Sequence, residues 1–191
     1  MSDIPTDAPP TERHEPELRR ADSLVLVNTG DGKGKSTAAF GTMIRSVARG
    51  WPVAVVQFLK SGSWNTGEEK VARDLGVEWF AIGEGFTWDS EDLSRDEAVA
   101  REAWDQAASL LVSGEHRLVV LDEITYPMNW GWIDVDEVVA AIRDRSPKVN
   151  VVCTGRDAPA ALLGVADTAT EMRVLKHAYD SGIRAMKGID Y

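Results

Sequence analysis

Short apolar runs alternate with helix-like patterns along most of this chain. Six runs stand out, at residues 24–28, 53–59, 77–82, 118–121, 151–153 and, more weakly, 172–175. Several are continuously apolar, which is typical of strands that are covered on both faces. Because strands that alternate with helices usually form parallel sheets joined by crossover helices, the pattern predicts an α/β fold with a mostly parallel central sheet.

Helical spacing fills several of the gaps between these runs. Residues 40–47 place apolar side chains on one helical face, and Gly50 supplies a stop. A Ser-Arg-Asp-Glu capping box predicts a longer helix over residues 94–114. A third helix is predicted to begin at Asp134 and to end before Pro147.

The first 22 residues break this pattern. Residues 1–22 hold four prolines and many charges without an apolar period. Such a segment buries too little apolar surface to offset its ordering entropy, so we expect a mobile N-terminal arm followed by one domain over residues 23–191. The arm is either an inert tail or a flap that orders over a ligand, and the sequence leaves both alternatives open.

Charge and cysteine content narrow the partners and the compartment. Lys and Arg number 21 against 31 Asp and Glu, which gives a net charge of −10. This field repels duplex nucleic acid and anionic lipid, so we expect neither as a partner. A single cysteine allows no internal disulfide, and no apolar stretch is long enough to span a bilayer, so a cytoplasmic location is predicted.

A glycine-rich segment lies between the first apolar run and the first helical pattern, where a phosphate-binding loop belongs. Its glycines would let backbone N–H groups turn inward beside a helix N-terminus, which favours a polyphosphate. Lys35 would reach the phosphate oxygens and Ser36 would hold Mg²⁺ or Mn²⁺. The alternative is a glycine-rich turn without a ligand. The predicted ATP-binding residues are Thr29, Gly30, Asp31, Gly32, Lys33, Gly34, Lys35, Ser36 and Thr37.

Charged side chains follow two later apolar runs. Asp122 and Glu123 come directly after residues 118–121 and would complete the shell of a Mg²⁺ ion bound through phosphates. They could instead cap the next loop. Arg156 follows the run at 151–153 and could clamp the same anion, although an ordinary surface arginine is nearly as good an interpretation.

Aromatic residues gather in two segments, 84–89 and 126–132, which could wall a large flat ligand beside the nucleotide. Packing under long loops or a dimer contact would explain the same residues. Trp64 and Trp79 also fall in or beside predicted loops. The three histidines are far apart in sequence and predict no zinc site.

Several of these segments together resemble the P-loop type of ATP:cob(I)alamin (corrinoid) adenosyltransferase. The resemblance covers nearly all of the chain after the arm. The segments that carry it are TGDGKGKSTAAFG from Thr29, VQFLK from Val56, NTGE from Asn65, GFTW from Gly85, LDEITY from Leu121, TGR from Thr154, AD from Ala166, KHA from Lys176 and GIDY from Gly188.

The resemblance implies a three-layer α/β/α P-loop NTPase fold of the RecA-like type, and a transferase activity. Co(I) of a corrinoid would attack the ribose 5′ carbon of ATP, with ATP held in reversed orientation, and triphosphate would leave. Lys35, Glu123 and Arg156 are the implied catalytic residues. Phe86 and Trp88 would press on the lower corrin face and displace its axial ligand. The resemblance also implies a flavoprotein reductant and a homodimer.

Three other functions share the phosphate loop. An ordinary P-loop small-molecule kinase or ATPase would cleave the terminal phosphate and release ADP. A nucleic-acid motor is disfavoured by the net charge of −10. A non-catalytic regulator would bind ATP without turnover.

Overall fold

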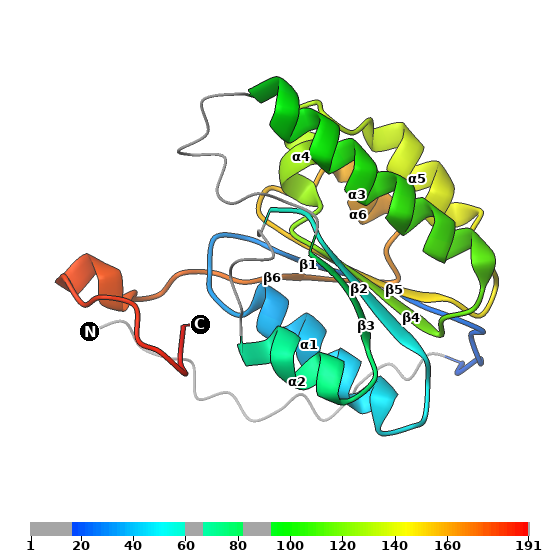
Figure 1. The fold of residues 1–191 in the computed structure, drawn as a ribbon, viewed down its shortest axis with the longest axis horizontal. Coiled ribbons are helices and arrows are strands. Elements are labelled where there is room, and N and C mark those ends of the chain that lie inside the picture. The colour runs from blue at the N-terminus through cyan, green and yellow to red at the C-terminus, as the bar shows by residue number, and fades with distance from the viewer. Residues whose placement is uncertain (1–16, 60–66, 82–92, 191) are drawn as a thin grey trace.

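A sheet of parallel strands forms the centre of the molecule (Figure 1). The computed structural model describes residues 17–59, 67–81 and 93–190. Within these residues the sheet has six strands in the order β3-β2-β4-β5-β1-β6, and every neighbouring pair is parallel. The strands are β1 (Val25–Thr29), β2 (Val53–Gln57), β3 (Glu78–Ala81), β4 (Leu118–Asp122), β5 (Asn150–Thr154) and β6 (Thr168–Glu171).

Helices cover both faces of the sheet, so the predicted three-layer α/β/α architecture is confirmed (Figure 1). One face carries α1 (Lys35–Val47) and α2 (Gly67–Asp74). The opposite face carries α3 (Leu93–Ser113), α4 (Thr125–Asn129), α5 (Val135–Arg143) and α6 (Ala160–Gly164). A short 3-10 helix, η2 (Ala178–Ser181), lies in the C-terminal segment.

The central strands bury side chains alternately on the two faces. In β4, Val119 and Leu121 join the core under α3 and α5, whereas Leu118 and Val120 join the core under α1. Each fully buried Val or Leu contributes about 1.5–3 kcal/mol relative to exposure, so the central strands are firmly held. Side chains at the strand ends therefore have well-fixed positions.

The predicted sixth strand is displaced. The structure places β6 at Thr168–Glu171, and residues 172–175 beyond it form neither helix nor strand. All four residues of β6 are exposed, because it is an edge strand held to β1 by backbone pairing. The sequence of β6, Thr-Ala-Thr-Glu, contains no apolar run. The sixth strand was therefore wrongly predicted at the next apolar residues, 172–175.

Helix ends were predicted with mixed success. Asp134 caps α5, since its Oδ1 accepts hydrogen bonds from the N–H groups of Asp136 (2.7 Å) and Glu137 (3.1 Å). The turn after α1 closes at Gly50, which has a φ of 70°. The structure begins α3 at Leu93, one residue before the predicted start at Ser94, and the capping box itself stays a prediction because the chain before α3 lies outside the described residues.

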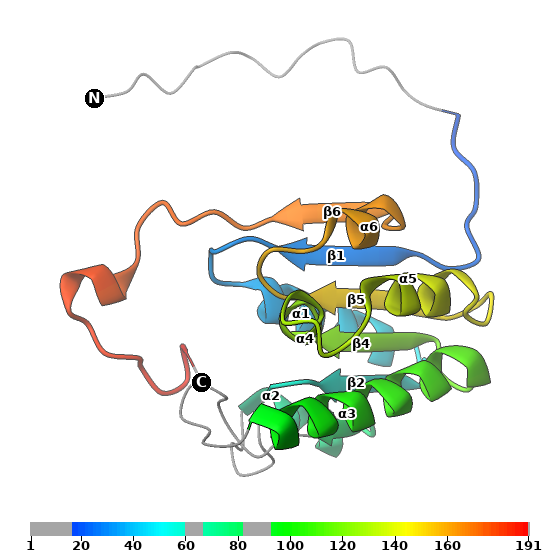
Figure 2. The same ribbon diagram turned by 90° about the horizontal axis from the view of Figure 1, so that it is seen from above.

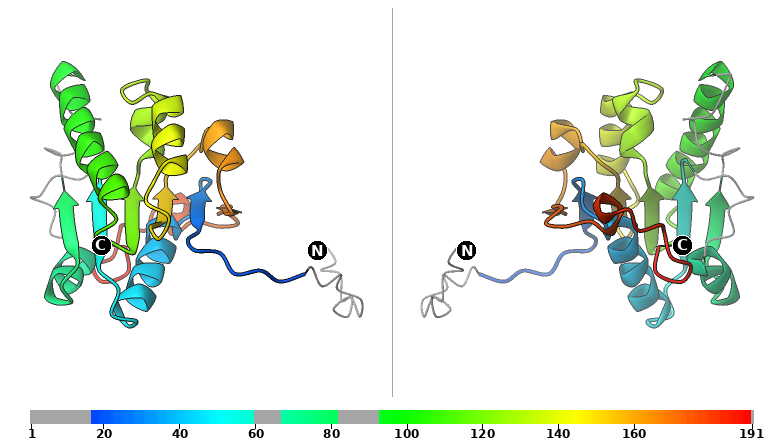
Figure 3. Two further views of the ribbon diagram at one scale, coloured as in Figure 1. Left: turned by 90° about the vertical axis from the view of Figure 1, so that its right-hand side faces the viewer. Right: turned by 90° about the vertical axis from the view of Figure 1, so that its left-hand side faces the viewer.

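The C-terminal segment, residues 172–190, passes beyond the carboxyl edge of the sheet (Figure 2). It then turns back toward α1 and α2, as the two side views in Figure 3 show. Gly188 and Ile189 line an apolar groove of about 360 Å³ with residues of α1 and α2. The segment therefore lies across the carboxyl edge of the sheet, which is where ligands bind in open α/β sheets.

The predicted N-terminal arm falls mostly outside the described residues. Residues 17–22 are exposed and form neither helix nor strand. The arm stays a prediction.

Candidate functional site

The glycine-rich loop connects the end of β1 to the start of α1. Gly30 and Gly34 have φ angles of 92° and 109°, in the left-handed region that disfavours side chains. Gly34 is also the N-cap of α1 and has no side chain to satisfy the helix's first N–H groups. These N–H groups and the positive end of the helix dipole form a place suited to an anion.

The chain leaving β6 presses against this loop. The Gly32 N–H donates to the Met172 carbonyl at 2.7 Å, and the Met172 N–H donates to the Thr29 carbonyl at 2.8 Å. A Cβ atom on Gly30 would lie 2.5 Å from the Met172 carbonyl oxygen, and one on Gly32 would lie 2.7 Å from its carbonyl carbon. The glycines are therefore required by packing as well as suited to phosphate binding.

Lys35 lies at the centre of the site. Its Nζ donates to the Gly32 carbonyl at 2.8 Å. Burial, followed by the nearby Arg156 guanidinium, lowers the pKa of Lys35, while Asp31, Glu123 and Asp122 act in the opposite direction. The structure thus brings together the predicted residues Lys35, at the start of α1, Glu123, just after β4, and Arg156, just after β5. Two cations this close would both be stabilised by a bound anion.

Asp122 and Glu123 have different surroundings. Asp122 is fully buried, and its carboxylate accepts hydrogen bonds from Thr154 Oγ1 (2.7 Å) and Gln57 Nε2 (2.9 Å). Glu123 is partly exposed and has a φ of 66°. Its N–H donates to Thr154 Oγ1 at 2.9 Å. Asp122 thus bonds to the strands on either side of β4, unlike an acid that caps a loop.

The loop opens into a cavity of about 490 Å³. Its lining combines predicted site residues with four residues of the C-terminal segment that the sequence analysis gave no role. The lining residues are Asp31, Gly32, Lys33, Lys35, Arg156, Val174, His177, Tyr179 and Asp180. Of the last four, His177 lies in the segment KHA that carries the resemblance, and Val174 lies in the weak apolar run at 172–175.

Lys33 holds the far end of the C-terminal segment. Its Nζ donates to Asp190 Oδ1 and forms an ion pair with it. The Lys33 hydrogen bond, followed by the Met186 N–H, lowers the pKa of Asp190. The predicted ATP-binding residue Lys33 therefore bonds to the protein itself in this structure.

A second cavity, of about 400 Å³, lies on the other side of the loop, between β6 and α6. Thr29, Gly30 and Asp31 line it together with Asp157 and Ala158. Thr29 Oγ1 accepts a hydrogen bond from the Ala158 N–H at 3.1 Å, which fixes this wall. Ser36 and Thr37, the last predicted residues of the loop, lie in the first turn of α1.

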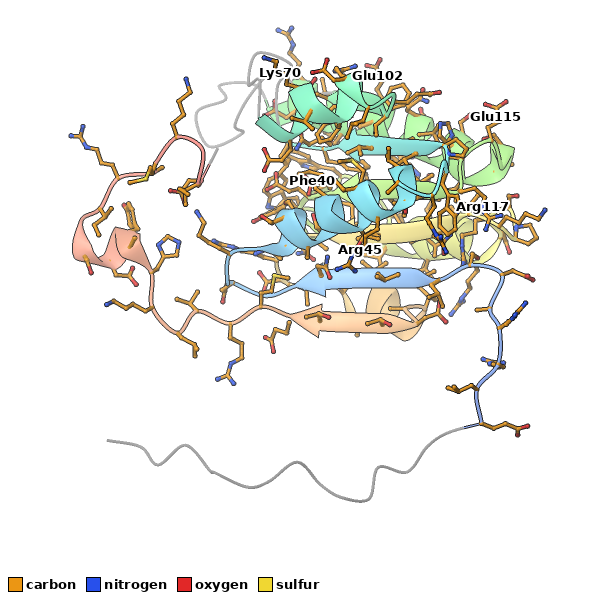
Figure 4. All side chains as sticks on the ribbon, turned by 90° about the horizontal axis from the view of Figure 1, so that it is seen from below. Phe40, Arg45, Lys70, Glu102, Glu115 and Arg117 are labelled. Atoms are coloured by element: carbon orange, nitrogen blue, oxygen red, sulfur yellow. The ribbon has the colours of Figure 1, made fainter. Side chains whose placement is uncertain are left out.

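The aromatic predictions fare unevenly. Trp79 is a core residue of β3, and the centre of its ring lies 5.2 Å from that of Phe40 on α1. Figure 4 labels Phe40 and views the molecule from the face of the sheet that α1 covers. The placement of Trp79 in or beside a loop is wrong, whereas the apolar run predicted at residues 77–82 correctly contains it; packing between β3 and α1 buries its side chain. Trp130 lies between Tyr126 (5.7 Å) and Trp132 (4.6 Å), and Trp132 packs against the core. Residues 126–132 include α4 rather than a plain loop.

Tyr126 also reaches the charged site. Burial, followed by Glu123, raises the pKa of Tyr126. Phe86, Trp88 and the rest of residues 84–89 lie outside the described residues, as does Trp64.

The donor set permits a metal held mainly by a nucleotide. Within residues 17–59, 67–81 and 93–190, no three His, Cys, Asp or Glu side chains cluster as a metal site. A hard divalent ion here would depend on phosphate oxygens and water, supplemented by oxygen ligands from Ser36, Asp122 or Glu123. In the same part of the chain, no helix is both long and apolar enough to cross a membrane.

A glycine loop between β1 and α1, with a strand-end acid pair two strands away, defines a P-loop nucleotide-binding protein of the α/β class. Its fold is similar to that of the flagellar accessory protein FlaH from Methanocaldococcus jannaschii, with a TM-score of 0.54 at 12% identity over 79% of this chain and 71% of that chain. Residues 21–191 match the family of ATP:corrinoid adenosyltransferases BtuR/CobO/CobP, and the chain belongs to this family.

Curated relatives agree with this assignment. The chain is 45% identical over 172 residues to a corrinoid adenosyltransferase from Sinorhizobium sp., covering 88% of this chain and 80% of the relative. It is 43% identical over 168 residues to the corrinoid adenosyltransferase of Escherichia coli K12, covering 88% and 85%. The family resemblance inferred from the sequence segments is confirmed.

Proposed function

We propose that this protein transfers the 5′-deoxyadenosyl group of ATP to Co(I) of a corrinoid. The cobalt electron pair forms a Co–C bond with the ribose 5′ carbon, the C–O bond to the phosphate chain breaks, and triphosphate leaves with that bonding pair. The phosphoryl bonds stay intact. The observation that carries the proposal, with family membership, is the convergence of Lys35 and Arg156 on the glycine-loop cavity.

The proposed work of the loop is to stabilise charge on the leaving triphosphate. Lys35, Arg156 and the first N–H groups of α1 are electrostatic groups rather than acids or bases. Each hydrogen bond to a charged group contributes about 1.5–3 kcal/mol, and more when it strengthens in the transition state. Because the strands fix these groups beforehand, little reorganisation is needed when the charge develops.

A Mg²⁺ or Mn²⁺ ion bound through the phosphates would neutralise part of the same charge. Ser36, Asp122 and Glu123 are the proposed ligands. The burial of Asp122 and the hydrogen bonds on both its oxygens favour Glu123 as the carboxylate that reaches the ion. Asp122 would then support Glu123 indirectly, through the Thr154 hydroxyl that bonds to both residues.

The corrinoid end of the site rests on the resemblance. Phe86 and Trp88 are proposed to contact the lower corrin face, and an external flavoprotein is proposed to supply the electron that makes Co(I). We also propose a homodimer, which exposed apolar side chains of the C-terminal segment, such as Leu175 and Ile189, support. A location in the cytoplasm is supported by the single cysteine, Cys153, which is fully buried and forms no disulfide.

Product analysis tests the proposal. Protein, ATP, Mg²⁺ and chemically reduced cobalamin are expected to give a light-sensitive Co–C product and inorganic triphosphate in equal amounts. The Lys35→Ala variant is the negative control. Release of ADP or orthophosphate in place of triphosphate would contradict adenosyl transfer and favour an ordinary kinase or ATPase.

A further inference from the structure

Four buried polar side chains form a row across the sheet beneath α1. They lie at or next to the carboxyl ends of four adjacent strands, where the preceding positions on the same face are apolar. The row consists of Gln57 (1% exposed), Asp122 (0%), Thr154 (0%) and Asn28 (8%), on β2, β4, β5 and β1.

The strand register places these residues side by side. Gln57 pairs with Asp122, and Asn28 pairs with Thr154. In a strand, residues two apart face the same side, so the row shares the α1 face with Val55, Val120 and Val152. The apolar core on that face therefore ends in a polar edge directly below the phosphate loop.

Hydrogen bonds connect the row to the helix above it. Gln57 Nε2 donates to Asp122 Oδ2 at 2.9 Å, and Thr154 Oγ1 donates to Asp122 Oδ1 at 2.7 Å. Asn28 Nδ2 donates to the carbonyl of Lys35, the first residue of α1, at 3.2 Å. Gln57, Asp122 and Thr154 are thus bonded to one another, and Asn28, their neighbour in the row, bonds to the residue that carries the loop's central ammonium group.

Thr154 also forms a hydrogen bond with the backbone of Glu123. Its hydroxyl donates to Asp122 and at the same time accepts the Glu123 N–H at 2.9 Å. Glu123 has a φ of 66°, a left-handed conformation that a residue with a side chain adopts only when its surroundings hold it there. One hydroxyl therefore ties the buried acid to the backbone of the partly exposed acid that follows it.

Fold stability alone is a weak explanation for such a row. Polar groups in a core lose their hydration, and replacing both partners of a buried pair by apolar groups of similar shape is often neutral or stabilising. Moreover, Gln57 Oε1 is buried without a hydrogen-bond partner among the described residues. A row built only for stability would satisfy this oxygen.

We propose that Thr154 is a positioning residue for the metal-binding edge of the site. Through Asp122 and the Glu123 N–H, it fixes where the Glu123 carboxylate lies relative to Lys35 and the phosphate loop. Gln57 supports it by holding the other oxygen of Asp122. This inference rests on the proposed role of Glu123 at a nucleotide-bound metal ion.

A matched pair of variants separates the hydroxyl from the shape of the side chain. Thr154→Val keeps the shape and removes the hydroxyl, whereas Thr154→Ser keeps the hydroxyl and removes the methyl group. The probe is Mn²⁺ with ATP and without corrinoid, so that no transfer occurs, and electron paramagnetic resonance measures the free Mn²⁺. Thermal unfolding is recorded for each variant.

Thr154→Val is expected to need about tenfold more Mn²⁺ for half-saturation, the effect of losing one hydrogen bond to a charged group. Thr154→Ser is expected to stay close to the wild type. A purely structural role would lower the melting temperature without this difference in Mn²⁺ dependence. Gln57→Leu removes the other donor to Asp122 and is expected to raise the requirement in the same direction, so it decides the matter if Thr154→Val does not fold.

Glu123→Ala distinguishes failure of this inference from failure of the proposed function. If Glu123→Ala raises the Mn²⁺ requirement and Thr154→Val does not, the positioning role of Thr154 is rejected and the metal role of Glu123 stands. If Glu123→Ala binds Mn²⁺ like the wild type, the metal role is rejected, and the positioning role with it.

Discussion

At the scale of single residues, the site depends on cations held close together. Burial and Arg156 both lower the pKa of Lys35, so its protonated form is less favoured in the free protein, and the proposed triphosphate would offset this effect. The Asp31 carboxylate lies 3.8 Å from the Arg156 guanidinium and partly offsets that charge in the free state. The site is therefore poised for an anion with several negative charges.

The affinity for ATP is expected to depend on pH through Lys35. If Lys35 binds the triphosphate as proposed, it does so as the protonated ammonium, so affinity is retained at lower pH and falls as the pH rises through the lowered pKa. Arg156→Gln removes one cause of the lowering, so the alkaline fall should move to higher pH even though binding weakens overall. Calorimetric titration of ATP without corrinoid, from about pH 7 to about pH 10, measures the shift.

Arg49→Gln serves as the control for this experiment. Arg49 is exposed just after the far end of α1, away from the loop. Its variant should reproduce the wild-type profile. Identical midpoints for the wild type and Arg156→Gln would show that Arg156 does not act on Lys35.

At the scale of helices and strands, the end of each element decides what it contributes. The strands β4 and β5 deliver Asp122 and Thr154 as their last residues, and α1 begins with Lys35. The cap on α5 also holds the backbone of Glu137 in the first turn of that helix. The Glu137 carboxylate in turn accepts a hydrogen bond from the Trp104 indole of α3, so the capped turn links the two helices.

Asp134→Ala is expected to destabilise the protein by about 0.5–2 kcal/mol, the usual effect of losing an N-cap. Its carboxylate satisfies two N–H groups of α5 that alanine would leave without a side-chain partner. Urea unfolding measures the change. Asp105→Ala, on the exposed side of α3, is the control, and an equal loss in both variants would contradict the capping role.

The sequence predicted the central strands because burial on both faces leaves continuous apolar runs, as in residues 118–121. It predicted the edge of the sheet poorly, because β6 is held by backbone pairing and shows only exposed side chains. Lys35 and Arg156 were predicted from their places after strands. The hydrogen bonds of Thr154 and the place of His177 in the cavity lining were not predicted, since bonds between strands and the return of the C-terminal segment leave no local pattern.

At the scale of the whole molecule, the C-terminal segment links the edge of the sheet to the phosphate loop. It begins at Met172, which bonds to the loop backbone, and ends at Asp190, which pairs with Lys33. Between these anchors most of its side chains are exposed. Two contacts with one loop therefore hold a segment that has little core of its own.

Asp190→Asn is expected to loosen this segment, because the amide removes the charge that Lys33 pairs with. Hydrogen exchange followed by mass spectrometry should show faster exchange around residues 186–190, and the strands should be unaffected. Arg184→Gln, an exposed change in the same segment, is the control. Unchanged exchange in Asp190→Asn would mean that the turn at Met186 holds the segment without Lys33.

The contact between Met172 and the glycine loop also constrains protein engineering. Any side chain at Gly30 or Gly32 would collide with the neighbouring backbone even in the absence of nucleotide. To redesign this loop for a different cosubstrate, one would therefore first have to move the backbone at Met172, just after β6, away from the loop. Only then could the residues expected to contact the nucleotide be changed.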